Sequence, residues 1–265
     1  MKKRILVITD CSDIAANDLY ATLVTNLDNL NTNKVVVEPI VVVSEFSVLH
    51  ASFVARLLAE AYNPDSLTIL AVVNPLDTST AKRARIAGRL KNGIKIVGAN
   101  TGVFTWLIND YGLDEVCETD ATGLQGKDFI SFGGKYIHAP IAAKYAVTDD
   151  INSIKIADFT ENDLMKLEYM PGMVLHIDNF GVAKIFLNAN DFSANNGDHL
   201  TLRKNGKELG ELTYCHSMKE LPDGALALYK GSSLGLLEIG TVRKLGTAKE
   251  LGLTIGDVVE IIPDH

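Results

Sequence analysis

The chain has 265 residues, of which 47% are hydrophobic and 22% are charged, and its formal net charge is −8. This length and composition suit one large domain or two ordinary ones with a buried core. The acidic balance excludes the basic face that nucleic-acid binding requires, so no nucleic-acid partner is expected. No stretch approaches the roughly 20 apolar residues of a membrane span, so no membrane partner is expected either.

The first 158 residues alternate short apolar runs with amphipathic segments. Strands are predicted at 4–9, 34–43, 66–73 and 94–99, with a possible break at Glu38-Pro39. Helices are predicted at 17–30, 48–62, 102–112 and 136–148, the last with Pro140 near its first turn. Residues 81–90 fit either a helix or a strand. The alternation predicts an α/β N-terminal domain, with a mostly parallel sheet covered by helices on both faces.

The pattern changes near residue 158. Residues 159–170 are predicted to form a linker, and residues 171–265 a smaller β-rich domain. Turn signals such as Asn205-Gly206 and Pro222-Asp223-Gly224 separate its strands, which are predicted at 173–181, 183–189, 199–204, 207–214, 225–231, 234–240 and 257–263. This spacing is typical of a small antiparallel barrel or sandwich.

The three cysteines, Cys11, Cys117 and Cys215, are far apart and form no CxxC pair. They fit a reducing compartment, so a cytoplasmic location is predicted, and they argue against structural zinc. Metal-ligand spacing is absent from the rest of the chain as well, so we expect neither a metal nor a cofactor. The apolar run after the basic start MKKR is too short for a signal peptide and indicates a first strand.

Two polar residues follow predicted strands, where open α/β sheets bind ligands. Asp10 ends the first strand, and its carboxylate suits the two vicinal hydroxyls of a ribose. The alternative role for Asp10 is the N-cap of the next helix. Asn100, in GANTG, offers both a donor and an acceptor, although an ordinary strand-to-helix turn is the favoured explanation.

Other candidate residues lie later in the chain. The run FGGKYIHAP suggests a tight loop, in which His138 is either a base or, more often for such a residue, structural. In HIDNFG, Asp178 and Phe180 share a face if the segment is a strand, and together they suit an amine beside a ring. The alternative is a turn aspartate and a core phenylalanine.

Seven motifs, in order and across both predicted domains, resemble one family, the S-adenosylmethionine (SAM) hydroxide adenosyltransferases, which are SAM hydrolases related to the fluorinase and chlorinase. The segments that carry the resemblance are TDCSDIAANDLYA, SVLHASFVARLL, LAVVNPLDTSTAKR, VGANTGVFT, SFGGKYIHAPIAA, HIDNFGV and SSLGLLEIG. They are similar to the family's TDFGxxDxYV, DVxxGAFLL, VAVVDPGVGTxRR, VGPDNGLLT, TFHGRDxFAPVAA, HIDxFGN and NSxGxLEIA.

The resemblance implies an α/β domain followed by a β-barrel domain, in a homotrimer whose sites lie between subunits. SAM is then a substrate or ligand, a small-molecule nucleoside partner, and a nucleophile attacks its C5′ and releases methionine. The resemblance assigns Asp10 to the ribose, Phe46 to stacking on the nucleoside, and Asp178, with Phe180 beside it, to the methionine amino group. Ser232 and Ser233 fall in the loop that approaches the adenine.

The family's three catalytic positions, an Asp, an Arg and a His, are altered in this chain. They correspond to Asn74, to Lys82 or Arg83, and to Gly133. An amide cannot act as a carboxylate base, and a glycine offers no side chain. A rearranged set of Asp77, Lys82 and Arg83 is the remaining candidate for holding water.

These residues leave an enzyme and a binding protein as competing predictions. Hydrolysis of SAM to adenosine and methionine is the preferred one. A binding protein that holds SAM or adenosine without turnover is the alternative, and a site adapted to another nucleoside stays open. Halogenation is disfavoured, because Asp77 falls where halogenases contact the halide with a hydroxyl, and a carboxylate there repels an anion.

Overall fold

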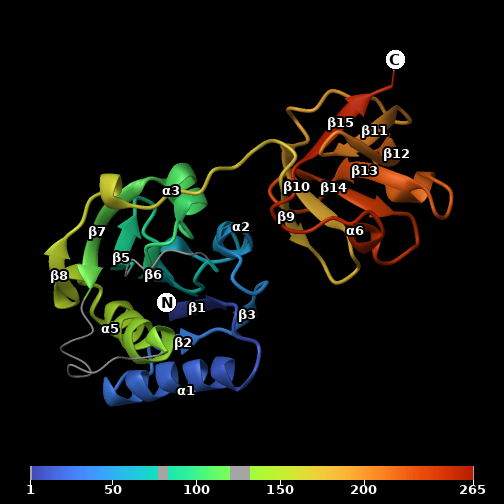
Figure 1. Cartoon of the computed structure of the whole chain (residues 1–265). Coiled ribbons are helices and arrows are strands. Elements are labelled where there is room, and N and C mark those ends of the chain that lie inside the picture. Colours follow the sequence, from blue (N-terminus) through green and yellow to red (C-terminus); the bar gives the residue numbers. More distant parts are fainter. Residues whose placement is uncertain (1, 77–82, 120–131, 265) are drawn as a thin grey trace. The chain divides into compact units, whose positions relative to one another are not determined.

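The computed structural model describes residues 2–76, 83–119 and 132–264, which divide into two compact units (Figure 1). The first unit comprises Met1–Leu167 and the second Glu168–His265. Residues 160–167 fold with the first unit, since the Asn100 side chain donates to the Asp163 carbonyl at 2.9 Å and accepts from the Met165 amide at 2.8 Å.

The first unit is built on an eight-stranded sheet. Its strands are β1 (Lys3–Thr9), β2 (Val35–Val37), β3 (Val41–Val42), β4 (Leu67–Val72), β5 (Arg85–Leu90), β6 (Lys95–Ala99), β7 (Leu113–Thr119) and β8 (Lys155–Asp158). The order is β2-β1-β4-β6-β5-β7-β8, with β3 also paired to β1. The break predicted at Glu38-Pro39 is confirmed, because it separates β2 from β3.

The prediction of a mostly parallel sheet is not confirmed. β1, β2, β3, β4 and β6 pair in parallel, but β5, β7 and β8 pair antiparallel. The cause is a tight turn at Asn92-Gly93, where the Leu90 amide bonds to the Ile94 carbonyl at 2.8 Å and Gly93 takes a φ of 100°. This hairpin makes residues 85–90 a strand and reverses its direction, and β7 and β8, which were not predicted, extend the reversed half.

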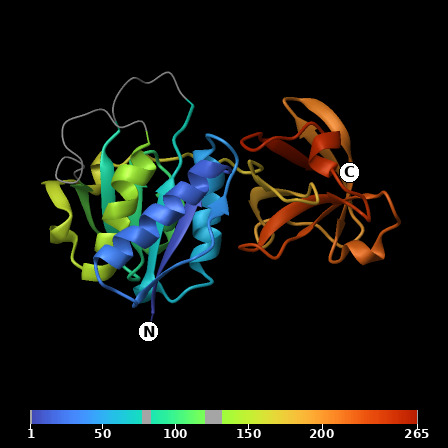
Figure 2. The same ribbon diagram turned by 90° about the horizontal axis from the view of Figure 1, so that it is seen from below.

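Helices cover both faces of this sheet (Figures 1 and 2). They are α1 (Ile14–Asn29), α2 (Val48–Ala59), α3 (Thr105–Tyr111) and α5 (Ala139–Thr148), with a π turn, η2 (Gly134–His138), just before α5 and short 3-10 turns η1 (Pro64–Ser66), η3 (Ile151–Ser153) and η4 (Glu161–Asp163). Leu19 and Leu23 of α1 pack with α5 against Ile5 and Val7 of β1. The intervening β1 residues point to the opposite face, where α2 packs, so this strand is buried on both sides.

The second unit is a seven-stranded sheet. Its elements are β9 (Val174–Ile177), β10 (Ala183–Asn188), β11 (His199–Lys204), β12 (Lys207–Cys215), η5 (Met218–Glu220), β13 (Leu226–Lys230), β14 (Leu236–Thr241), α6 (Thr247–Glu250) and β15 (Val259–Pro263). The order is β15-β11-β12-β13-β14-β10-β9. All seven strands were predicted, and every pairing is antiparallel except β12 with β13.

Backbone hydrogen bonds also join the two ends of this second sheet. Met173 bridges Val258, the Val174 amide donates to the Asp257 carbonyl at 2.7 Å, and the Val259 amide donates to the Gly172 carbonyl at 3.0 Å. Gly172 permits this approach, because it has a φ of 79° and a Cβ there would lie 2.0 Å from the Val259 carbonyl oxygen.

Replacing Gly172 with alanine is expected to destabilise the second unit. The matched control is Gly206→Ala, because Gly206 has a similar φ of 74° but no atom lies within 4 Å of the place that an added methyl would occupy. The control should lose about 1 kcal/mol of unfolding free energy from the backbone conformation alone, and Gly172→Ala about 1–3 kcal/mol more from the clash. Denaturant unfolding measures both values, and equal losses would contradict the role of the close approach.

Candidate functional site

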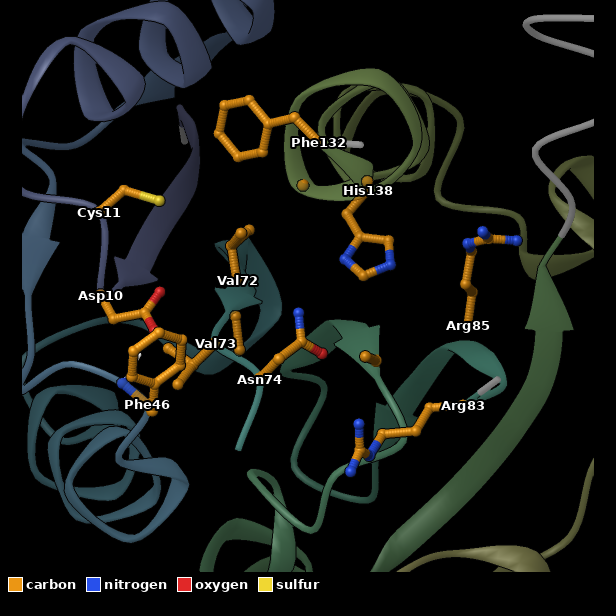
Figure 3. Close-up of a pocket in the computed structure, with 14 residues that line it drawn as sticks. Asp10, Cys11, Phe46, Val72, Val73, Asn74, Arg83, Arg85, Phe132 and His138 are labelled. Atoms are coloured by element: carbon orange, nitrogen blue, oxygen red, sulfur yellow. Dashed lines mark hydrogen bonds between the residues drawn. The ribbon is translucent and has the colours of Figure 1, made fainter. Parts of the chain in front are cut away.

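A cavity of about 400 Å³ opens at one edge of the first unit's sheet (Figure 3). Asp10 follows β1, Asn74 follows β4, and Ala99 ends β6, so three parallel strands contribute their carboxyl ends. Because β5 runs antiparallel to β6, its first residue, Arg85, pairs with Ala99 and lies at the same edge. The cavity therefore occupies the place where open α/β sheets bind ligands.

A buried hydrogen bond ties the two central strands together beside this cavity. The Thr9 hydroxyl donates to the Val72 carbonyl at 2.9 Å, and it also accepts from the Cys11 amide at 3.1 Å. The residues that follow each strand, Asp10 and Val73, are thereby held in fixed positions on the cavity wall.

Asp10 faces the cavity and does not cap the following helix. Asp13 is the N-cap of α1, since its side chain accepts from the Ala15 amide at 2.9 Å. Asp10 instead accepts the Phe46 amide at 3.0 Å through Oδ2. Among the described residues, no hydrogen bond to Oδ1 is found, so this oxygen is available to a ligand hydroxyl.

Phe46 is held beside Asp10 in an unusual backbone conformation. Its φ is 56°, a value that is costly for an aromatic residue, and its side chain is half exposed at the cavity. The loop is fixed on its other side by His50, whose Nδ1 accepts the Ser44 amide at 3.0 Å. The chain thus holds an aromatic ring next to a carboxylate, an arrangement that suits a nucleoside.

The other end of the cavity carries amide, guanidinium and imidazole groups. Figure 3 shows the His138 ring directed toward Asn74, with Arg85 beyond it and Arg83 below. Arg83 and Asn74 were predicted site residues, and the structure brings them together. Arg85 was not predicted from the sequence, and His138 was named there only as a possible base or a structural residue. The turn signal Asn92-Gly93, which reverses β5, is the sequence feature that places Arg85 here.

His138 is a buried, neutral imidazole. Its side chain is only 7% exposed, and burial, followed by the nearby positive charge of Arg85, lowers its pKa to about 4. The ring therefore carries no charge at neutral pH and keeps one nitrogen lone pair. Among the described residues, nothing hydrogen-bonds to its Nδ1.

Two glycines shape the wall beneath His138. A Cβ on Gly134 would lie 2.3 Å from a methyl of Val72, so this position must be small for η2 to approach β4. A Cβ on Gly133 would meet only Ile137, at 3.8 Å, so a side chain has room to leave the backbone there. The histidine position of the family motif is thus vacant but not blocked.

The remaining predicted residues of the first unit fall outside this cavity. Asp77 and Lys82 lie outside the described residues. Asn100 is buried and does not line the cavity, and both polar ends of its amide bind residues 163–165.

The residues assigned to methionine and adenine belong to the second unit. Asp178 follows β9 in a turn, where its Oδ1 accepts the amides of Phe180 and Val182, both at 2.9 Å. The segment is therefore not a continuous strand, and Phe180 is 57% exposed rather than in the core. Ser233 is buried and Ser232 is exposed in the turn that precedes β14.

Neither a cluster of metal ligands nor a membrane-spanning helix is present in the described part of the chain. No group of three or more His, Cys, Asp and Glu residues is arranged to hold a metal ion. Within the same residues, no helix has the length and apolar character needed to cross a bilayer.

The pKa of His138 predicts a pH-dependent stability. The unfolded histidine binds a proton near its ordinary pKa of 6.5, whereas the folded one resists protonation down to about 4. Stability is therefore full above pH 6.5 and falls as the pH drops toward 4, by up to about 3 kcal/mol. Denaturant unfolding between pH 7 and roughly 4.5 should show a flatter dependence for His138→Gln, and identical slopes would contradict the assignment.

The chain is similar in sequence to a protein of known name. The (R)-S-adenosyl-L-methionine hydrolase of Methanocaldococcus jannaschii is 23% identical over 180 residues, which cover 66% of this chain and 64% of that protein. The chain therefore matches less than two thirds of that relative's length.

Two solved structures share the fold of the whole chain. An uncharacterized conserved protein from Thermotoga maritima has a TM-score of 0.80 at 22% identity, covering 97% of this chain and 99% of its own. A conserved hypothetical protein from Thermus thermophilus has a TM-score of 0.75 at 22% identity, covering 99% and 100%.

The family comparison covers the unit that holds the cavity. Residues 7–155 match the SAM hydroxide adenosyltransferase N-terminal domain, a span of more than half of the chain. The resemblance found from the sequence motifs is confirmed, and the protein belongs to the SAM hydroxide adenosyltransferase family.

Proposed function

We propose that the cavity binds S-adenosylmethionine and that the protein hydrolyses it to adenosine and methionine. Membership of the family and a relative that is named a SAM hydrolase support this proposal. The observation that carries it is the pairing of Asp10 and Phe46 at the strand ends, because a fixed carboxylate beside an exposed ring suits the ribose and base of an adenosyl group.

Asp10 is preorganised for a sugar. Its bond to the Phe46 amide fixes the carboxylate, and Oδ1 then accepts a ribose hydroxyl without rearrangement. The same bond holds the loop that carries the ring, so sugar recognition and base stacking depend on one local structure. In the proposed complex, Asp178, Phe180, Ser232 and Ser233 contact the methionine and adenine ends, as the family resemblance implies.

The reaction is a displacement at C5′. The oxygen of water attacks C5′, the C5′–sulfur bond breaks, and its electron pair leaves with sulfur as the neutral thioether of methionine. The water loses a proton, so the products are adenosine, methionine and H⁺. A sulfonium leaving group needs no general acid, and accurate placement of water supplies much of the rate. Arg83, which lines the cavity, is proposed to help hold this water. Asp77 and Lys82 are proposed to contribute to the same task.

A second candidate function is binding without turnover. Asn74 and Gly133 stand where the family motifs have a carboxylate and a histidine, and this observation favours a degenerate site. Calorimetry with SAM and with adenosine separates the two functions, since a binding protein retains the ligands but forms no product. A homotrimer is also part of the proposal, and light scattering of the purified protein tests it.

The activity test follows adenosine by chromatography after purified protein is incubated with SAM. Adenosine above a heat-inactivated control supports hydrolysis. SAM binding without the formation of adenosine supports the second function, binding without turnover. If neither SAM nor adenosine binds, both proposed functions are contradicted.

Asp10→Asn should weaken SAM binding about 10- to 100-fold, because the ribose hydroxyl then bonds to a neutral amide instead of a charged carboxylate. The matched control is Asp13→Asn, which lies three residues away and caps α1, a role that asparagine also fills. Calorimetry measures both dissociation constants. Equal SAM affinities for the two variants would contradict the assignment of Asp10 to the ribose.

A further inference from the structure

His138 is the most deeply buried titratable side chain that lines the cavity. In the family motif its position is aromatic, so the motif comparison assigned it no chemistry. Its ring nevertheless points into the cavity toward Asn74 (Figure 3).

The imidazole is unsatisfied where it lies. Its Nδ1 is buried without a hydrogen bond to any described residue. An unpaired polar atom in a protein interior costs about 1–3 kcal/mol, and native structures contain few of them. A ring nitrogen that is buried and unpaired, on a side chain that lines a cavity at the strand ends, is explained by a bound hydrogen-bonding partner.

The π turn determines where this ring lies. In η2 the Ala139 amide bonds to the carbonyl of Gly134, five residues earlier, instead of four. This turn is wider than an α-helical turn, so it changes which residues share a face of the helix. Gly134 allows the turn to pack directly on Val72, which brings the ring to the level of Asn74. Such turns are frequent at functional sites.

The charge state of the ring suits the acceptance of a proton from water. Burial and the charge of Arg85 keep the imidazole neutral, so a lone pair is present throughout the neutral range. Its low pKa makes it a weak base, which holds water by accepting a hydrogen bond and releases any captured proton readily. Beside it, the Asn74 amide offers both a donor and an acceptor.

We propose that His138 is a catalytic residue that accepts the hydrogen bond of the attacking water and takes its proton as the C5′–oxygen bond forms. The C5′–sulfur bond breaks in the same step, methionine leaves, and the proton passes from the imidazole to solvent. This role rests on the hydrolysis proposed above. The family motif has a histidine at the position of Gly133, and in this proposal His138, five residues later, takes its place.

The test measures SAM turnover and SAM affinity for His138→Phe and His138→Gln. Phenylalanine fills a similar volume without an acceptor, and glutamine keeps an acceptor without a proton-transfer role. Removal of a general base lowers rate constants about 10²- to 10⁴-fold, so kcat should fall at least about 100-fold for His138→Phe, with the dissociation constant of SAM changed less than about threefold. His199→Gln, an exposed histidine of the second unit, should retain wild-type kcat.

Two further measurements separate catalysis from a structural role. Adding Gly133→His to His138→Phe should restore part of kcat, because a side chain has room to leave the backbone at 133. Among the described residues, the other titratable groups that line the cavity are Asp10, Cys11, Arg83 and Arg85. In the wild-type protein, protonation of His138 at acidic pH should lower kcat. The residual activity of His138→Gln should not show this loss at acidic pH.

The outcomes distinguish this inference from the proposed function. Wild-type protein that forms no adenosine overturns both. Wild-type turnover with unchanged kcat in His138→Phe and His138→Gln overturns the inference alone. Loss of SAM binding in both variants while their folded stability is retained also overturns it, because His138 would then bind substrate rather than hold water.

Discussion

The antiparallel pairing of β5 with β6 is the constraint on which the proposed site depends. It places Arg85 opposite Ala99, so the first residue of one strand lies at the same edge as the last residue of its neighbour. With a parallel β5, Arg85 would lie at the opposite edge of the sheet, away from Asp10. The reversed strand thus adds the Arg85 guanidinium to a cavity that carries the Asp10 carboxylate at its other end, with Asn74 between them.

This separation of charge suits the proposed reaction. Displacement at a sulfonium disperses a positive charge instead of creating a new one, so the site needs little stabilisation of developing charge. In the proposed reaction, a neutral amide and a neutral imidazole orient the water, and Asp10 provides the negative charge at the sugar.

The sequence predicted the main elements because their patterns are local. The apolar run of β1 and the seven short strands of the second unit are confirmed. The direction of β5 was not predicted, since 85–90 has no periodicity that distinguishes strand from helix, although the turn at Asn92-Gly93 carried the missing information.

The composition of the site was harder to predict than the fold. Motif comparison found Asp10, Phe46, Asn74 and Arg83, which line the cavity. It assigned no chemistry to His138, because the family motif has an aromatic residue at that position, although the sequence alone had offered this histidine as a possible base.

The backbone bonds between Gly172–Val174 and Asp257–Val259 have a consequence for synthesis on the ribosome. They join segments separated by nearly the whole length of the second unit, so its first strand cannot complete its pairing until the last strand has been translated. The nascent second unit therefore remains open while the first unit already has all of its own residues. Its closure is a late event, governed by the exit of the final strand.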